Sequence, residues 1–439
     1  MNMATFRIGM TVFLGLLVSA NAHAVPSMGR QTGMQCASCH TVFPELTPFG
    51  RQFKLRGFSQ KAPNVKFPAS LPISALLQVS WNSTRKTKGT DPENFPRNNE
   101  VIPQAVGLYY GGKITEKSGA LIQGFYDGIE DKVMMEMFDV RYADSFSIAD
   151  NQELVYGLTL NNNPTVSDIY NSTPQWSFPH TETAALSPAA RTQIDTTLAS
   201  QVGGLGVYTL WNNLVYGEAA FYRSARRGLL RPLGAGVPTE NVVNDFVPYW
   251  RVALQHEWGS HSLAAGTYGM VADVFPDPNN TGGSTDRFTD VALDAQYQYI
   301  GGAHIVSTAA TWIREAQDWN ASFDQGFTSN KSDVLQTFRM DAHYYYQRRF
   351  GGGIQFFSTW GNSNELKYNT GEPVTGSTNG KPNSDGLIAE LNYLPWSNVK
   401  LAARYTAYGK FNGARHNYDG FGRNASDNDS IFLLAWLLF

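Results

Sequence analysis

Hydrophobic and polar residues alternate with a period of two along much of the chain after residue 70. The alternation is clearest at residues 251–257, 338–346 and 399–406, where Val, Leu, Met or Tyr side chains stand between Arg, Asp, Lys or His side chains. Successive side chains of a β-strand point to opposite faces, so this pattern predicts strands with one apolar and one polar face. A soluble β-sandwich and a membrane barrel with a polar lumen both fit this periodicity.

The number of such segments and the connections between them favour the barrel. We interpret about sixteen segments as strands, centred on residues 73–81, 104–113, 120–127, 134–144, 153–161, 203–211, 214–223, 248–257, 262–270, 289–300, 304–314, 335–347, 351–360, 386–394, 399–408 and 430–439. Short and long connections alternate, except at the short 128–133, where a long loop is expected. An even strand number with short turns at one rim and long loops at the other is typical of outer-membrane barrels.

Composition agrees with this prediction and excludes other classes. Only 16% of the residues are charged and 13% are aromatic, against about 25% charged in an average soluble protein. A mean hydropathy of −0.30 is too polar for a multi-span helical membrane protein. The net charge of −3 argues against a nucleic-acid partner. We therefore predict an all-β fold, a 16-stranded antiparallel transmembrane β-barrel over residues 71–439 that contacts outer-membrane lipid.

The amino terminus has the features of a secretory signal peptide. Arg7 precedes an apolar stretch at residues 8–19, and Ala22-His23-Ala24 has the form that signal peptidase cleaves. The alternative is a membrane anchor, but the apolar stretch is short for a bilayer span. We expect residues 1–24 to be removed and the mature protein to be exported.

The two cysteines of the chain form the motif Cys36-Ala37-Ser38-Cys39-His40. In a C-x-x-C-H motif each thiol forms a thioether to one haem vinyl group, and the following histidine ligates the iron. A redox pair or half of a zinc site is the alternative, but a zinc site needs further ligands and the next histidine is His180. The sequence therefore predicts one covalent haem c with His40 as its proximal ligand.

Residues 25–70 are predicted to form a small monohaem c-type cytochrome domain. About 46 residues are too few for a stable core, so the haem would supply the surface on which the aromatic and aliphatic side chains pack. The expected packing partners are Phe43, Leu46, Phe49, Phe53, Leu55 and Phe58. Six basic residues and one acid, Glu45, make this segment basic.

The sequence leaves open which residues pair with the haem propionates and which residue is the distal iron ligand. Arg51, Lys54 and Arg56 are candidates to pair with its propionates. Met28 and His343 are candidates for the distal iron ligand, His343 because its position in the alternating pattern points it inward. An open iron site is also compatible with the sequence.

A barrel of about sixteen strands encloses a lumen, and the haem domain is expected to plug or adjoin it from the periplasmic side. Acids predicted to face inward would then hold the basic haem domain. The acids expected to do so are Glu218, Glu257, Asp341 and Glu390.

The haem segment resembles a known family. The sequences GRQTGMQCASCH at residues 29–40, FPELTPFGR at 43–51 and FKL at 53–55 closely resemble the fused monohaem cytochrome–porins of iron-oxidising bacteria. The resemblance covers about 30 residues, and it matches Cys36, Cys39 and His40 to the haem attachment and proximal ligand. It implies an outer-membrane protein that oxidises extracellular Fe(II) and passes electrons through the haem to a periplasmic cytochrome or copper protein.

Two other functions fit the same residues. One is a porin whose haem segment is a structural plug, and the other is electron delivery outward to an extracellular acceptor. The sequence leaves open the redox potential, the direction of electron flow, solute conduction, the identity of the periplasmic partner, and whether the protein is a monomer or a trimer.

Overall fold

The structure is a computed structural model that describes residues 26–62, 71–87, 96–149, 152–224 and 240–439. The predicted signal peptide and residues 63–70 of the predicted haem domain lie outside the described residues. Among the described residues, no helix is both long enough and apolar enough to cross a membrane.

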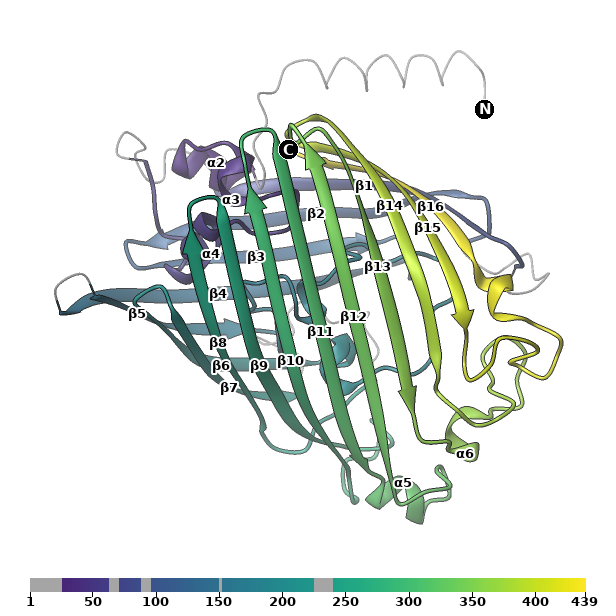
Figure 1. Ribbon diagram of the computed structural model, residues 1–439. Helices are drawn as coiled ribbons and strands as arrows, with labels where there is room; N and C mark the ends of the chain where they lie inside the picture. Colours follow the sequence, from purple (N-terminus) through teal and green to yellow (C-terminus); the bar gives the residue numbers. More distant parts are fainter. Residues whose placement is uncertain (1–25, 63–70, 88–95, 150–151, 225–239) are drawn as a thin grey trace.

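The strands form a closed barrel in which each strand pairs antiparallel with its neighbours in sequence (Figure 1). The ring closes between β1 and β16, from Leu76 opposite Leu438 to Thr84 opposite Ser430. The prediction of a 16-stranded antiparallel barrel is confirmed. The strands are β1 (Ile73–Thr84), β2 (Val101–Thr115), β3 (Ser118–Asp127), β4 (Lys132–Ala149), β5 (Gln152–Asn161), β6 (Val202–Trp211), β7 (Val215–Ser224), β8 (Val247–Trp258), β9 (His261–Val274), β10 (Asp286–Ile300), β11 (His304–Asp318), β12 (Ser332–Tyr346), β13 (Phe350–Gly361), β14 (Ser384–Trp396), β15 (Val399–Lys410) and β16 (Ser430–Leu438).

The connections divide the barrel into two ends, which we call the turn end and the loop end. Short turns at 116–117, 212–214, 259–260, 301–303, 347–349 and 397–398 join strands at the turn end. At the loop end the connections are longer, and short helices lie in them: α5 (Asn320–Asp324), α6 (Glu365–Tyr368) and η4 (Ala425–Asn428). The short connection between β3 and β4 is the exception that the sequence pattern anticipated. Phe439 extends β16 because its N–H donates to the Ala75 carbonyl at 2.9 Å.

The outer face of the barrel is apolar and the inner face is largely polar. On β8, Val252 and Leu254 are 48% and 58% exposed, whereas Arg251 beside them is 1% exposed. On β12, Met340 and Tyr344 face outward while Asp341 and His343 are buried inside. This is the arrangement of a barrel whose outer wall meets lipid, and it is the reverse of a soluble sandwich.

Two segments fill the lumen from opposite ends. From the turn end, residues 26–62 enter with helices α2 (Pro26–Thr32), α3 (Cys36–Cys39) and α4 (Pro48–Leu55), drawn in purple in Figure 1. From the loop end, the connection 162–201 between β5 and β6 folds inward, with the short turns η1 (Pro174–Trp176) and η2 (Gln193–Thr197). The two segments meet where the Leu46 N–H donates to the Asn171 side chain at 2.9 Å.

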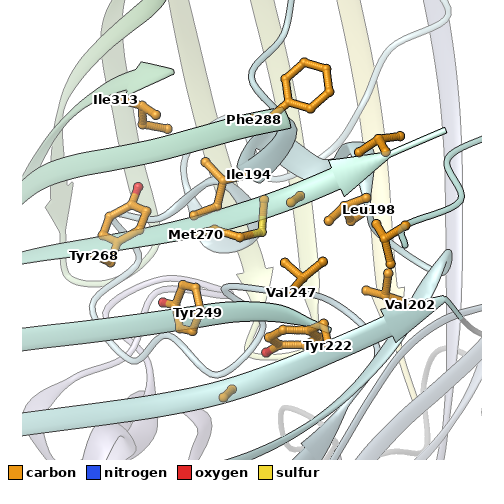
Figure 2. Packing of buried hydrophobic residues seen from close by; sticks show 14 of the residues in the cluster. Ile194, Leu198, Val202, Tyr222, Val247, Tyr249, Tyr268, Met270, Phe288 and Ile313 are labelled. Atoms are coloured by element: carbon orange, nitrogen blue, oxygen red, sulfur yellow. The ribbon is translucent and has the colours of Figure 1, made fainter. Parts of the chain in front are cut away.

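Part of the inner face is apolar, whereas the alternating pattern predicts a polar inner face. Ile194 and Leu198 of the inward connection pack against the barrel wall in a buried apolar cluster (Figure 2). The wall contributes residues of β6 to β11, including Val202, Tyr222, Val247, Tyr249, Tyr268, Met270, Phe288 and Ile313. These wall positions face inward and the inward connection covers them, so their apolar side chains form a core instead of a water-filled channel.

Candidate haem site

The cysteines and histidine of the C-x-x-C-H motif lie on and beside one short helix. Cys36 and Cys39 begin and end α3, and His40 follows as its carboxy-terminal cap, with its N–H donating to the Cys36 carbonyl at 2.9 Å. Both cysteines are half-buried. One helical turn therefore carries both thiols and the imidazole that the attachment of one haem requires.

Helix α3 is fixed to the start of α4. The Thr47 N–H donates to the Cys39 carbonyl at 2.9 Å, and its hydroxyl donates to the Ser38 carbonyl at 2.6 Å. Gly50, one turn into α4, lies so close that a Cβ there would be 2.2 Å from the Cys39 carbonyl oxygen. Thr47 also caps α4 by accepting a hydrogen bond from the Gly50 N–H at 3.1 Å. The Thr47 cap and the absence of a side chain at Gly50 together hold the motif against the start of α4.

The His40 ring is oriented as a metal-ligating histidine should be. Its Nδ1 lies 3.1 Å from the Pro44 carbonyl oxygen, which can only accept, so Nδ1 carries the proton and Nε2 keeps its lone pair. The ring stacks on Phe43 with centroids 5.0 Å apart. Burial lowers the pKa of His40 to about 4, although the hydrogen bond to Pro44 opposes this shift. A neutral imidazole is the form that binds iron.

The Cys39 thiol is held in its protonated form. Burial raises the pKa of the Cys39 thiol to about 11, and the neighbouring Cys36 adds to the shift. A redox nucleophile requires a thiolate, which this environment disfavours. A zinc site needs further ligands, and among the described residues no group of three or more His, Cys, Asp or Glu side chains could hold a metal ion.

The motif faces a large cavity inside the barrel. The cavity has a volume of about 570 Å³, within the usual range of cofactor sites, and Cys36, Cys39 and His40 line it. Four of the six expected haem-packing residues, Phe43, Leu46, Phe53 and Phe58, also line it. The other two do not. Phe49 is 36% exposed, and Leu55 packs instead against Val155, Tyr208 and other wall residues.

The three candidate propionate partners have different surroundings. Arg51 donates to the side chains of Ser262, Gln296 and Gln298 at 3.1, 3.0 and 2.6 Å, so its guanidinium docks α4 onto the inner wall. Arg56 is 2.6 Å from the Glu153 carboxylate near the rim. Neither lines the cavity, whereas Lys54 does. The propionate role stays a prediction for all three, and the cavity favours Lys54.

The acids that pair directly with the basic segment are not the four expected, although Glu257 and Glu218 act electrostatically on Arg51 and Lys54 from farther away. Lys54 lies 3.7 Å from Asp139 of β4, and Arg56 pairs with Glu153 of β5. The four acids named from the sequence have partners in the barrel wall and its turns. Glu390 pairs with Lys400 and Arg404, Asp341 with His343, Glu218 with Tyr216, and Glu257 with Asn213. Glu390 is bound by two bases of the neighbouring strand β15, Asp341 and Glu218 by side chains two residues away on their own strands, and Glu257 by a turn residue.

The two candidates for the distal ligand are placed differently. Met28 of α2 lines the cavity. His343 points into the barrel as predicted, but it does not line the cavity, and its Nε2 lies 3.2 Å from Asp341 and 3.8 Å from Glu45. Sequence reasoning missed His180, Met134 and Met137, which line the cavity as well. The polar stretch around His180 carries no sequence signal that it folds inward.

Neither a protein-family model nor a curated protein sequence matches this chain. Among solved structures it is similar to OmpT, an outer membrane protein of Vibrio cholerae, with 12% identity and a TM-score of 0.42, covering 84% of this chain and 98% of that one. It is also similar to OmpF of Salmonella typhi in complex with daunomycin, with 13% identity and a TM-score of 0.47, covering 84% and 97%. A third is the outer membrane channel DcaP of Acinetobacter baumannii, with 8% identity and a TM-score of 0.46, covering 84% and 96%.

Proposed function

We propose that this protein is an outer-membrane electron-transfer cytochrome that takes electrons from extracellular Fe(II). Cys36 and Cys39 would attach one haem c inside the barrel, and His40 would ligate its iron. The bound haem would supply a one-electron centre. Fe(II) at the loop end is oxidised to Fe(III), and its electron leaves at the turn end to a periplasmic cytochrome or copper protein.

The observation that carries the proposal is the position of the motif. Cys36, Cys39 and His40 line a cavity within the lumen, and His40 Nε2 is left unprotonated by the contact of Nδ1 with Pro44. A haem there would lie between the two ends of a membrane-spanning barrel. The choice of Fe(II) as donor rests on the resemblance of residues 29–55 to cytochrome–porins.

The charge of the cavity wall supports a cationic donor. Towards the loop end, Asp127 and Glu130 at the β3–β4 connection, Glu182 of the inward connection and Glu240 before β8 line the same cavity. Fewer bases, among them Lys132 and Arg191, accompany them. An excess of carboxylates in a low-dielectric cleft raises the local concentration of cations.

The porin alternative is supported by the closed barrel but opposed by its contents. Residues 26–62 and 162–201 both occupy the lumen, and side chains such as Arg51 and Lys54 join them to the wall and to each other. A porin needs an open aqueous path through the lumen. Single-channel conductance in a planar bilayer separates the two functions, since a free diffusion pore predicts large, steady ion currents.

The proposal is tested with protein purified from a host that matures c-type cytochromes. Adding Fe(II) to the oxidised protein in detergent is expected to produce the visible spectrum of a reduced haem c. A Cys36→Ser, Cys39→Ser double variant serves as the control that lacks the attachment site. A wild-type protein with no covalent haem, or with a haem that Fe(II) leaves oxidised, contradicts the proposal. A low midpoint potential would favour the outward direction instead.

A further inference from the structure

The peptide from Phe178 to Glu182 is held by three side chains of the barrel wall. Gln355 of β13 donates to the Phe178 carbonyl, Arg404 of β15 donates to the Thr181 carbonyl at 2.7 Å, and Gln104 of β2 donates to the Glu182 carbonyl at 2.7 Å. These donors come from distant strands and bind consecutive parts of one short peptide. The backbone around His180 is therefore positioned rigidly within the lumen.

The imidazole of His180, in contrast, has no polar partner. It lines the cavity that Cys36, Cys39 and His40 line, and it makes no hydrogen bond with any described residue. Its Nδ1 is buried, and the Phe178 ring lies edge-on with its centroid 5.9 Å away. An unsatisfied buried polar group costs about 1–3 kcal/mol, so its retention calls for a partner.

Two other histidines of the barrel, His261 and His304, have polar partners, since their Nδ1 atoms lie 2.8 Å from the Tyr297 and Tyr344 hydroxyls. His343 also has a buried Nδ1 without a hydrogen-bond partner, but its Nε2 lies 3.2 Å from Asp341 and it does not line the cavity. Burial, aided by the nearby Lys400, lowers the pKa of His180 well below its usual value, so its imidazole is neutral. A neutral imidazole with free nitrogens, on a fixed peptide at the cavity wall, is what a metal ligand requires.

We propose that His180 is the second axial ligand of the haem iron, in place of Met28 or His343. This inference rests on the proposed function, because it requires a haem attached at Cys36 and Cys39. It also gives the inward connection a specific role, since the loop 162–201 then completes the coordination of a haem attached to the amino-terminal segment.

The test compares three variants of the haem-loaded protein by absorption and magnetic circular dichroism. His180→Ala is expected to convert a low-spin ferric haem into a high-spin one, and added imidazole is expected to restore the low-spin spectrum. His180→Met should keep the haem low-spin but give the signature of histidine–methionine ligation. Met28→Leu, on the same cavity wall, should leave the wild-type spectrum unchanged.

The outcomes separate this inference from the proposed function. Covalent haem is measured independently, by haem staining of the denatured chain. If wild type carries no covalent haem, both proposals fail. If it carries haem and His180→Ala remains low-spin, or Met28→Leu becomes high-spin, only the assignment of His180 is overturned. Loss of reduction by Fe(II) in His180→Ala without a change in spin state would also overturn it, in favour of an imidazole that binds the iron donor.

Discussion

The two halves of the barrel interior are filled in opposite ways. At the loop end, Ile194 and Leu198 sit in an apolar cluster packed against the wall (Figure 2). At the turn end, residues 26–62 are docked by buried polar contacts such as those of Arg51 and Lys54, and they border a cavity of about 570 Å³ that reaches Glu182 and Glu240 towards the loop end. The packed half buries apolar side chains against β6 to β11. The hollow half keeps open space beside Cys36, Cys39, His40 and His180, where we propose that a haem binds.

The largest expected effect is at the hollow half. In the Cys36→Ser, Cys39→Ser double variant we expect complete loss of covalent haem, because the two thioethers have no other thiols to form on. The barrel should still fold, since its strands pair without the motif. Haem staining and the heat-dependent gel mobility of the barrel measure the two effects separately. Retained covalent haem would refute the attachment site.

A substitution in the packed half should lower the stability of the protein and leave its haem content unchanged. Leu198→Ala removes a side chain that is 1% exposed, and such a cavity costs about 2–5 kcal/mol of folding free energy. Urea unfolding in detergent micelles measures this loss, while the haem content per chain should stay at the wild-type value. If Leu198→Ala empties the haem site instead, the two halves are not independent.

Lys54 provides a pH test of how the hollow half is docked. Burial lowers its pKa from the ordinary lysine value of 10.5, which the unfolded chain keeps, to about 8, although Asp139 opposes the shift. Between pH 8 and 10.5 the unfolded chain binds more protons, so this residue makes stability rise with pH, by about 3 kcal/mol in all.

The measurement compares unfolding free energies with and without Lys54→Met in the background of the haem-free cysteine double variant. The difference between the two proteins should grow from pH 8 to 10.5 in favour of Lys54. A difference that stays constant over this range would show that the amine is protonated normally, with Asp139 fully compensating for burial.

A smaller effect is expected when α4 is released from the wall. Arg51→Met removes three buried hydrogen bonds to Ser262, Gln296 and Gln298, at a cost of about 2–3 kcal/mol. Limited proteolysis should then cut residues 26–62 faster while the barrel stays intact. Arg56→Met is the matched control on the same segment. Its partly exposed pair with Glu153 is worth less than about 1 kcal/mol, so equal proteolysis of both variants would contradict this docking.

The two halves also differ in how far the sequence predicts them. Alternating residues such as Arg251, Val252 and Leu254 are enough to predict the strands, their faces and the closed barrel, because a lipid-facing wall imposes a period of two. The C-x-x-C-H motif at Cys36 to His40 is enough to predict covalent haem attachment. The fold of 162–201 is not predictable, since its burial depends on donors such as Arg404 and Gln104 that lie far away in sequence. For this reason the sequence does not single out His180. It also does not identify Asp139 and Glu153, the acids that pair directly with Lys54 and Arg56.

In the proposed function electrons, and not iron, cross this barrel. The most direct measurement uses proteoliposomes that contain the haem-loaded protein. One sample encloses oxidised soluble cytochrome c, and another encloses a chelator that becomes coloured when it binds Fe(II). Fe(II) is added outside. We expect the enclosed cytochrome c to be reduced while the enclosed chelator stays colourless. Colour in the chelator sample, or cytochrome c that remains oxidised, would contradict it.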